Sequence, residues 1–123
     1  MIKKIEKPWG WEEIWAIADS YVGKIIVINP GHRLSKQYHQ FKTETVYVIE
    51  GILLNYDEND DVETFRSGQS LHIEPGQIHR FGATKDRYVK IVEVSSNHLD
   101  DVVRIEDDSL RGDGRIQSEH IDA

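Results

Sequence analysis

Apolar residues recur at every second position along most of the chain, in short runs separated by turn-forming residues. This alternation is typical of β-strands that bury one face, whereas a sustained helical spacing is hard to find before residue 97. We therefore predict nine strands, at residues 11–16, 24–29, 34–40, 45–49, 52–56, 62–65, 70–73, 79–81 and 88–94. Short strands at such regular spacing predict an all-β sandwich or barrel.

The length and composition of the chain suit one folded domain. The chain has 123 residues, of which 38% are hydrophobic, which is enough for one core and too little for two separate ones. We expect residues 1–123 to form a single domain. Glycine, charged and small polar residues dominate residues 112–123, so this tail is expected to pack loosely.

The charge and the apolar content argue against two classes of partner. Lys and Arg total 15 against 22 Asp and Glu, a net charge of −7 without a long basic stripe, so no nucleic-acid partner is expected. The longest apolar runs, such as residues 25–28, are far shorter than the ~20 residues of a membrane-spanning helix. The N-terminus lacks the continuous apolar stretch of a signal peptide. We therefore expect a soluble, cytoplasmic protein without a membrane partner.

The absence of cysteine means that any metal site must use histidine, carboxylate or amide ligands. Gln37 and His39 lie two apart on a predicted strand, so both point to the same face. Glu44 follows after a short turn, and His79 opens a later strand. Closure of the strands into a barrel would bring the four side chains around one divalent ion, with Zn, Mn, Fe, Co and Ni as candidates. Spacing alone leaves open the alternative that they are ordinary polar residues of strands.

Two segments resemble the conserved motifs of the cupin superfamily. The first covers residues 30–51, and the second covers residues 68–79. The spacing of the first motif is matched by Gly31, Gln37, His39, Glu44 and Gly51. Most cupins have histidine where this chain has Gln37. With glutamine at this position, the chain resembles the isomerase-like branch of the superfamily.

Within the superfamily, residues 7–111 resemble the type II mannose-6-phosphate isomerase domain. The similarity is carried by an N-terminal Pro-Trp-Gly element at residues 8–10, by the segment around Gln37 and His39, and by residues 100–108 with Arg111 after them. The chain departs from the family where Val46 and Ala83 stand in place of tryptophan and asparagine. We expect the domain to stand alone, without the guanylyltransferase domain to which it is fused in larger enzymes, and the identity of the substrate stays open.

The resemblance implies a cupin double-stranded β-helix, which is a jelly-roll barrel, with its core at residues 7–111. It also implies a sugar-phosphate pocket in the mouth of the barrel and a reaction that interconverts mannose 6-phosphate and fructose 6-phosphate, or a related one. The metal ligands that it implies are Gln37, His39, Glu44 and His79.

An aldose–ketose isomerisation needs an electrophile at the carbonyl, a base beside it and a group that holds the phosphate. The bound ion would be the electrophile. The candidates for the base are Lys36, Glu93 and a metal-bound hydroxide, which the sequence does not rank. Arg33, Lys42 and Arg80 lie near the expected ligands in sequence, and guanidinium groups bind phosphate well. The alternative for these basic residues is pairing with surface carboxylates.

Two other functions are alternatives at this stage. A metal-dependent oxygenase would use iron and consume oxygen, whereas a sugar-binding or regulatory cupin would keep the metal and lack the base. Fold alone does not decide among them, because one fold hosts many chemistries. We also expect a homodimer, because exposed sheet edges in small barrels need covering.

Overall fold

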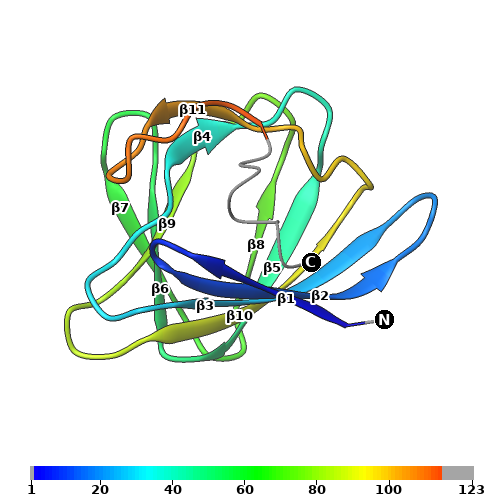
Figure 1. Ribbon diagram of the computed structural model, residues 1–123. Helices are drawn as coiled ribbons and strands as arrows, with labels where there is room; N and C mark the ends of the chain where they lie inside the picture. The colour runs from blue at the N-terminus through cyan, green and yellow to red at the C-terminus, as the bar shows by residue number, and fades with distance from the viewer. Residues whose placement is uncertain (1, 115–123) are drawn as a thin grey trace.

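The computed structural model describes residues 2–114, and this part of the chain is built from strands (Figure 1). No helix in it has the length and apolar character needed to span a membrane. The eleven strands are β1 (Lys3–Lys7), β2 (Gly10–Ile17), β3 (Val22–Ile28), β4 (Lys36–Tyr38), β5 (Glu44–Glu50), β6 (Ile52–Tyr56), β7 (Val62–Arg66), β8 (Ser70–Ile73), β9 (Arg80–Ala83), β10 (Val89–Ser95) and β11 (Val103–Glu106).

The strands form two layers that face each other. The larger layer is a six-stranded sheet with the order β1-β2-β3-β10-β5-β8, and all its pairs are antiparallel. The second layer combines the sheet β7-β6-β9 with the pair β11-β4. Backbone bridges from Arg33 to Gly82 and from Gln37 to His79 join these two parts. Figure 1 shows β7 and β9 at the left of the barrel and β4 with β11 across the top.

The space between the layers is filled by the side chains at every second position of the strands, which form the inward phase of the alternating pattern. Its inward side chains include Ile26 and Ile28 of β3, Val89 and Ile91 of β10 and, from the second layer, Phe81, all at most 3% exposed. Burial of such side chains contributes roughly 1.5–3 kcal/mol each. The core therefore fixes the register of the central strands, because a shift by one residue would turn the apolar phase outward.

At one end of the barrel, the same inward phase becomes polar. Glu44 continues the phase of Val46 on β5, Glu93 continues that of Ile91 on β10, and Lys24 of β3 is the register partner of Glu93. These charged side chains are buried, with 3%, 4% and 9% of their surface exposed. The strands that build the apolar core therefore also position a buried polar cluster.

All nine predicted strands are present, and the all-β barrel is confirmed. The main shortening is at residues 34–40, where only β4 keeps strand pairing. Sequence patterning missed β1 and β11, because each is short and mostly charged or half-exposed, so the apolar alternation is weak. The loose tail predicted for residues 112–123 falls largely on residues 115–123, which lie outside the described residues.

The register between β5 and β10 can be tested at Gly51, where φ is 85° and an added Cβ would lie 2.4 Å from the Tyr88 carbonyl oxygen. Gly68 is a matched control, since its φ is 90° and an added Cβ would meet nothing within 4 Å. In both variants the alanine has to adopt a left-handed backbone conformation, which costs roughly 1–2 kcal/mol. We expect the free energy of unfolding in urea to fall by about 1–3 kcal/mol more in Gly51→Ala than in Gly68→Ala, because the added Cβ clashes with backbone. Equal losses would contradict this packing.

Candidate metal centre and its pocket

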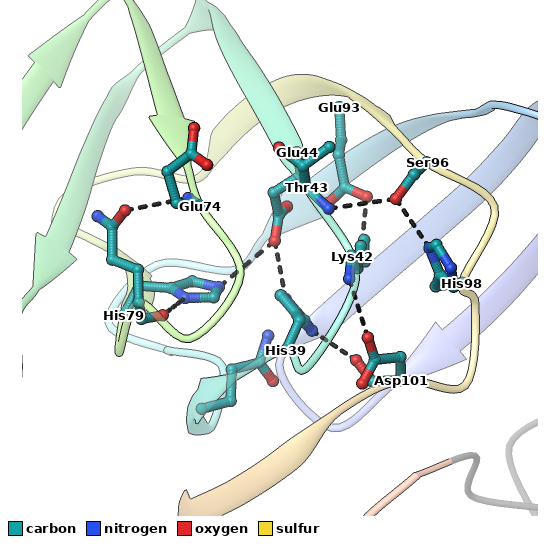
Figure 2. A network of polar contacts seen from close by, with 12 residues as sticks. His39, Lys42, Thr43, Glu44, Glu74, His79, Glu93, Ser96, His98 and Asp101 are labelled. Atoms are coloured by element: carbon teal, nitrogen blue, oxygen red, sulfur yellow. Dashed lines mark hydrogen bonds and ion pairs between the residues drawn. The ribbon is translucent and has the colours of Figure 1, made fainter.

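Three side chains from separate strand ends meet inside the barrel (Figure 2). His39 follows β4, Glu44 begins β5, and His79 precedes β9. Their potential ligand atoms all lie within 4.8 Å of one another, and the residues are 2%, 3% and 1% exposed. The structure therefore brings together three of the four ligands that the resemblance implies, in a place from which water is largely excluded.

The hydrogen bonds of the two imidazoles determine which nitrogen faces Glu44. Nδ1–H of His39 donates to the backbone carbonyl of Asp101 at 2.6 Å, and Nδ1–H of His79 donates to that of Gln77 at 3.0 Å. Such bonds fix the tautomer in metal sites and leave Nε2 as the ligand atom. Both Nε2 atoms then approach Oε1 of Glu44, at 2.9 Å from His39 and 3.5 Å from His79.

This arrangement suits a cation. In the neutral tautomers, two nitrogen lone pairs and a carboxylate oxygen converge, which is unfavourable unless positive charge lies between them. His79 Nε2 is buried and has no hydrogen-bond partner. Imidazole and carboxylate together are a donor set for divalent first-row ions. The three side chains therefore fit a metal ion better than they fit one another.

The fourth expected ligand, Gln37, lies in the pocket wall beside this group. Its backbone N–H and carbonyl pair with those of His79, at 3.0 Å and 2.9 Å, so the two residues are held together. The Gln37 amide oxygen accepts a hydrogen bond from the Ser35 hydroxyl at 2.7 Å. A carbonyl oxygen has a second lone pair, so this bond orients the amide and leaves acceptor capacity for an ion.

Asp101 anchors the turn that carries His39. Its carboxylate accepts the backbone N–H groups of Gln40, Phe41 and Lys42 at 3.0, 2.8 and 2.9 Å. Burial tends to raise the pKa of the Asp101 carboxyl, but these three hydrogen bonds outweigh that effect and lower it. Together with the carbonyl that receives His39 Nδ1–H, Asp101 holds both ends of this short loop.

Glu93 lies next to the metal-type cluster and pairs with Lys42 at 3.1 Å. Burial, followed by the neighbouring carboxylate of Glu44, raises the pKa of Glu93 to about 7, against the opposing effect of Lys42 and Lys24. Burial also acts to raise the pKa of Glu44, but opposing charge, foremost that of Lys42, holds it well below its ordinary value. Two adjacent carboxyls thus have opposite pKa shifts, which is typical of sites that move protons.

Of these groups, all but His79 line a cavity of about 180 Å³ that opens at the mouth of the barrel. The cavity also has an apolar wall that includes Trp9, Ile26 and Phe81. Its basic side chains are Lys3, Lys7, Lys24, Lys42, Arg104 and Arg111. Its acidic ones are Glu12, Glu44, Glu93, Asp100 and Asp101. Among the described residues that line the cavity, basic side chains therefore outnumber acidic ones by six to five, although the whole chain carries a net charge of −7.

Three of the predicted site residues lie away from the cavity. Arg33 and Arg80 both bind the carboxylate of Asp108, with N–O distances of 2.7 and 2.9 Å. Lys36 Nζ donates to the Glu58 carbonyl at 2.9 Å. The reason is strand alternation: Arg80 and Lys36 are direct neighbours of His79 and Gln37, so they point to the opposite face. The structure thus favours the surface-pairing alternative for the arginines and, of the two predicted side-chain bases, brings only Glu93 to the site.

Sequence reasoning missed a second buried polar group on the same cavity wall, formed by Lys7, Glu12 and Lys24. A signal was available for two of them. Lys24 shares its strand phase with Ile26 and Ile28, and Glu12 shares its phase with Ile14. A charged residue in an otherwise apolar phase indicates an inward charge. For Lys7 and Asp101 there was no comparable local signal.

Comparisons with known proteins agree with this geometry. The profile of the family described as "Mannose-6-phosphate isomerase C-terminal" matches residues 1–107. A curated relative, the xanthan biosynthesis protein XanB of Xanthomonas campestris pv. campestris (strain B100), is 30% identical over 108 residues. That alignment covers 85% of this chain and 23% of the relative, so the chain spans less than a quarter of that protein's length.

Solved structures show the fold. The polyketide cyclase RemF from Streptomyces resistomycificus has a TM-score of 0.74 at 18% identity, over 85% of this chain and 80% of that one. A sugar phosphate isomerase of the cupin superfamily from Silicibacter pomeroyi has a TM-score of 0.64 at 18% identity, over 76% of this chain and 64% of that one. From the family profile and this double-stranded β-helix, the chain belongs to the mannose-6-phosphate isomerase C-terminal family of cupins.

Proposed function

We propose that this protein is a metal-dependent cupin that isomerises a phosphorylated sugar, and that it interconverts mannose 6-phosphate and fructose 6-phosphate. One observation carries the proposal: Glu93, a buried carboxyl, lies beside the His39–Glu44–His79 cluster and faces the same cavity. An isomerase needs an electrophile and a proton carrier at adjacent carbons of one substrate, and these two features are adjacent here.

The residues that would hold the ion are His39, Glu44 and His79, with the Gln37 amide oxygen as the fourth ligand. A divalent ion bound there would polarise the sugar carbonyl and stabilise the negative charge that develops on its oxygen. Glu93 then takes the proton from C2 of the aldose and returns it to C1. The hydroxyl proton of O2 passes to O1, so atoms and charge balance.

Lys42 has a supporting task in this scheme. Its ammonium group contacts Glu93 at 3.1 Å and is itself buried, with 8% of the side chain exposed. The contact holds the Glu93 carboxylate in one orientation while the proton is absent, and it neutralises the charge that burial makes costly. The apolar wall around these groups keeps bulk water from competing for the proton.

The test uses protein stripped of metal by a chelator and reloaded separately with Zn²⁺, Mn²⁺, Fe²⁺, Co²⁺ or Ni²⁺. Interconversion of mannose 6-phosphate and fructose 6-phosphate in at least one loaded form, and not in the stripped form, is the expected result. Oxygen consumption with iron would instead support the oxygenase alternative. Sugar-phosphate binding without turnover under any metal would support a binding or regulatory protein.

The role of Glu93 can be separated from metal binding with Glu93→Gln. We expect kcat to fall about 10²–10⁴-fold, the usual contribution of a positioned acid or base, while the metal content stays unchanged. Glu13→Gln on β2 is the control, because Glu13 lies in the opposite strand phase from Glu12 and Ile14. A Glu93→Gln enzyme with normal kcat would show that another group moves the proton.

The ligand assignment predicts that His79→Ala loses bound metal while the protein remains a folded β structure. The affinity should fall at least ~100-fold, since even loss of a group that only orients a ligand costs 10–100-fold. His72→Ala is the matched control, because His72 is exposed and bonds to Glu74 and Thr45 on the sheet surface. Metal per chain after dialysis gives the readout. Stoichiometric metal in His79→Ala would overturn the assignment.

Asp101 is predicted to act on the same centre without touching the ion. Asp101→Ala removes the acceptor of three backbone N–H groups, so the loop carrying His39 loses its anchor. We expect metal affinity to fall about 10–100-fold in competition with a chromophoric chelator. Asp100→Ala tests the neighbouring carboxylate, which lines the cavity and lacks this anchoring role. Equal effects of the two variants would contradict a positioning role for Asp101.

A further inference from the structure

The outer side of the six-stranded sheet carries an apolar surface that takes no part in the core or in the cavity. It lies on the four neighbouring strands β2, β3, β10 and β5, of which Figure 1 shows β2, β3 and β10 along the side of the barrel opposite β4 and β11. Its side chains point outward because they alternate with buried inward ones. We call this surface the outer apolar face, and it consists of Trp15, Ile25, Tyr47, Ile49, Val92 and Val94.

The register of the strands makes this face continuous. Val92 on β10 is the partner of Ile25 on β3 and of Tyr47 on β5, so these three side chains form a row across the sheet. Ile49 continues the outward phase of Tyr47 along β5. Apolar side chains that are paired across neighbouring strands pack against one another, so the row presents a single uncharged surface.

An irregularity in β2 extends the face to that strand. The pairing between β2 and β3 shifts between Ile14 and Ala16, at Trp15. The indole of Trp15 lies over Gly23, since a Cβ added to this glycine would be 2.6 Å from an indole carbon. Gly23 is in turn the register partner of Val94. A β-bulge re-aims a side chain, and this one carries the Trp15 ring across β3 toward Val94.

The exposed apolar area is close to what a stable dimer needs. Trp15, Tyr47, Ile49 and Val94 are 42%, 51%, 38% and 49% exposed. With typical side-chain areas, these fractions amount to roughly 300 Å² of apolar surface. A stable interface buries ~800 Å² on each partner, of which somewhat more than half, or ~450 Å², is apolar. The two half-buried members of the row bring the face near that requirement.

The arrangement of the face is self-complementary. Its aromatic side chains lie at opposite ends, Trp15 on β2 and Tyr47 on β5, with branched aliphatic ones between them on β3 and β10. A twofold axis that runs along the strands, between β3 and β10, places β2 of one copy on β5 of the other. Each Trp15 then meets the partner's Tyr47. Two sheets packed face to face keep their strands within about 30° of each other, which this axis allows.

Charge and chain position favour a second copy over the C-terminal segment as the occupant. Each copy carries a net charge of −7, and contact through six uncharged side chains keeps the repelling charges apart. Gly114, the last described residue, lines the cavity, which lies on the inner side of the sheet. The nine residues after it contain only two large apolar side chains, Ile116 and Ile121, which are too few to match the face.

We propose that this protein forms a symmetric homodimer through the outer apolar faces of two copies, with β2 of each copy on β5 of its partner. The contact is on the face of the sheet and not on the exposed strand edges from which the dimer was first expected. It does not depend on the reaction that the protein catalyses. The partner copy supports from outside the two strands whose inner sides carry Glu44 and Glu93.

The first test places a charge in the face. Val94→Lys introduces an ammonium group at a position that is 49% exposed. Val62→Lys is the matched control, because Val62 is also 49% exposed but lies on β7 in the second layer. Sedimentation equilibrium should show a dimer for the unmodified chain and association weakened at least about 100-fold in Val94→Lys, since the dimer would bury an unpaired charge. Val62→Lys should associate as the unmodified chain does.

Circular dichroism and thermal unfolding establish that each variant is folded before sedimentation. A monomeric unmodified chain at every concentration would overturn the dimer. Val94→Lys that associates as tightly as the unmodified chain would place the contact elsewhere, for example at the strand edges, and would overturn the face. Equal losses in Val94→Lys and Val62→Lys would also overturn it, because the effect would then not depend on position.

The second test addresses the pairing of β2 with the partner's β5. Trp15→Glu and Tyr47→Lys each place one charge at one end of the face, and each variant alone should associate at least about tenfold more weakly than the unmodified chain. In an equimolar mixture, the introduced carboxylate of one chain meets the introduced ammonium group of the other, while the remaining Tyr47 meets the remaining Trp15. We expect the mixture to associate at least about tenfold more tightly than either variant alone. A mixture no tighter than the separate variants would overturn this pairing.

Discussion

Inside the barrel, charged groups of alternating sign follow one another across five strands and the turn before β5, and each is coupled electrostatically to the next. The row runs through Lys7, Glu12, Lys24, Glu93, Lys42 and Glu44. In an enclosed space of low polarity, each of these charges is tolerated because it has an opposite neighbour. Since the neighbours are on different strands, the row is formed only when every strand holds its register. The apolar core and the polar site therefore depend on the same alignment.

Strand alternation, by which successive side chains point to opposite faces, explains which parts of the site could be predicted from the sequence. Alternation placed Gln37 and His39 on one face and Glu93 in phase with Val89 and Ile91, and the structure shows them so. Alternation played no part in the choice of the basic candidates for phosphate binding, which rested on their closeness to the ligands in sequence. Adjacent residues in a strand point apart, so Lys36 and Arg80 lie outside the cavity. Lys42, two residues before Glu44, lines it.

Other parts of the site follow from contacts that local patterns do not encode. Asp101 reaches the loop of His39 from about 60 positions along the chain, and only the closed barrel brings the two together. Lys7 lies on β1, which has a single buried apolar residue and therefore a weak strand signal. The departures from the family pattern, such as Val46, did not affect the cluster, because Val46 packs in the core beyond Glu44.

The cavity is lined by two polar groups from different strands. The metal-type ligands come from the ends of β4, β5 and β9, whereas the buried ionic group of Lys7, Glu12 and Lys24 comes from β1, β2 and β3. Changes in the first three strands can therefore alter one wall of the cavity without moving His39, Glu44 or His79. Relatives of this fold have names as different as a polyketide cyclase and a sugar phosphate isomerase. A scaffold whose metal-type cluster and whose opposite cavity wall lie on separate elements allows such divergence, because one can change while the other stays in register.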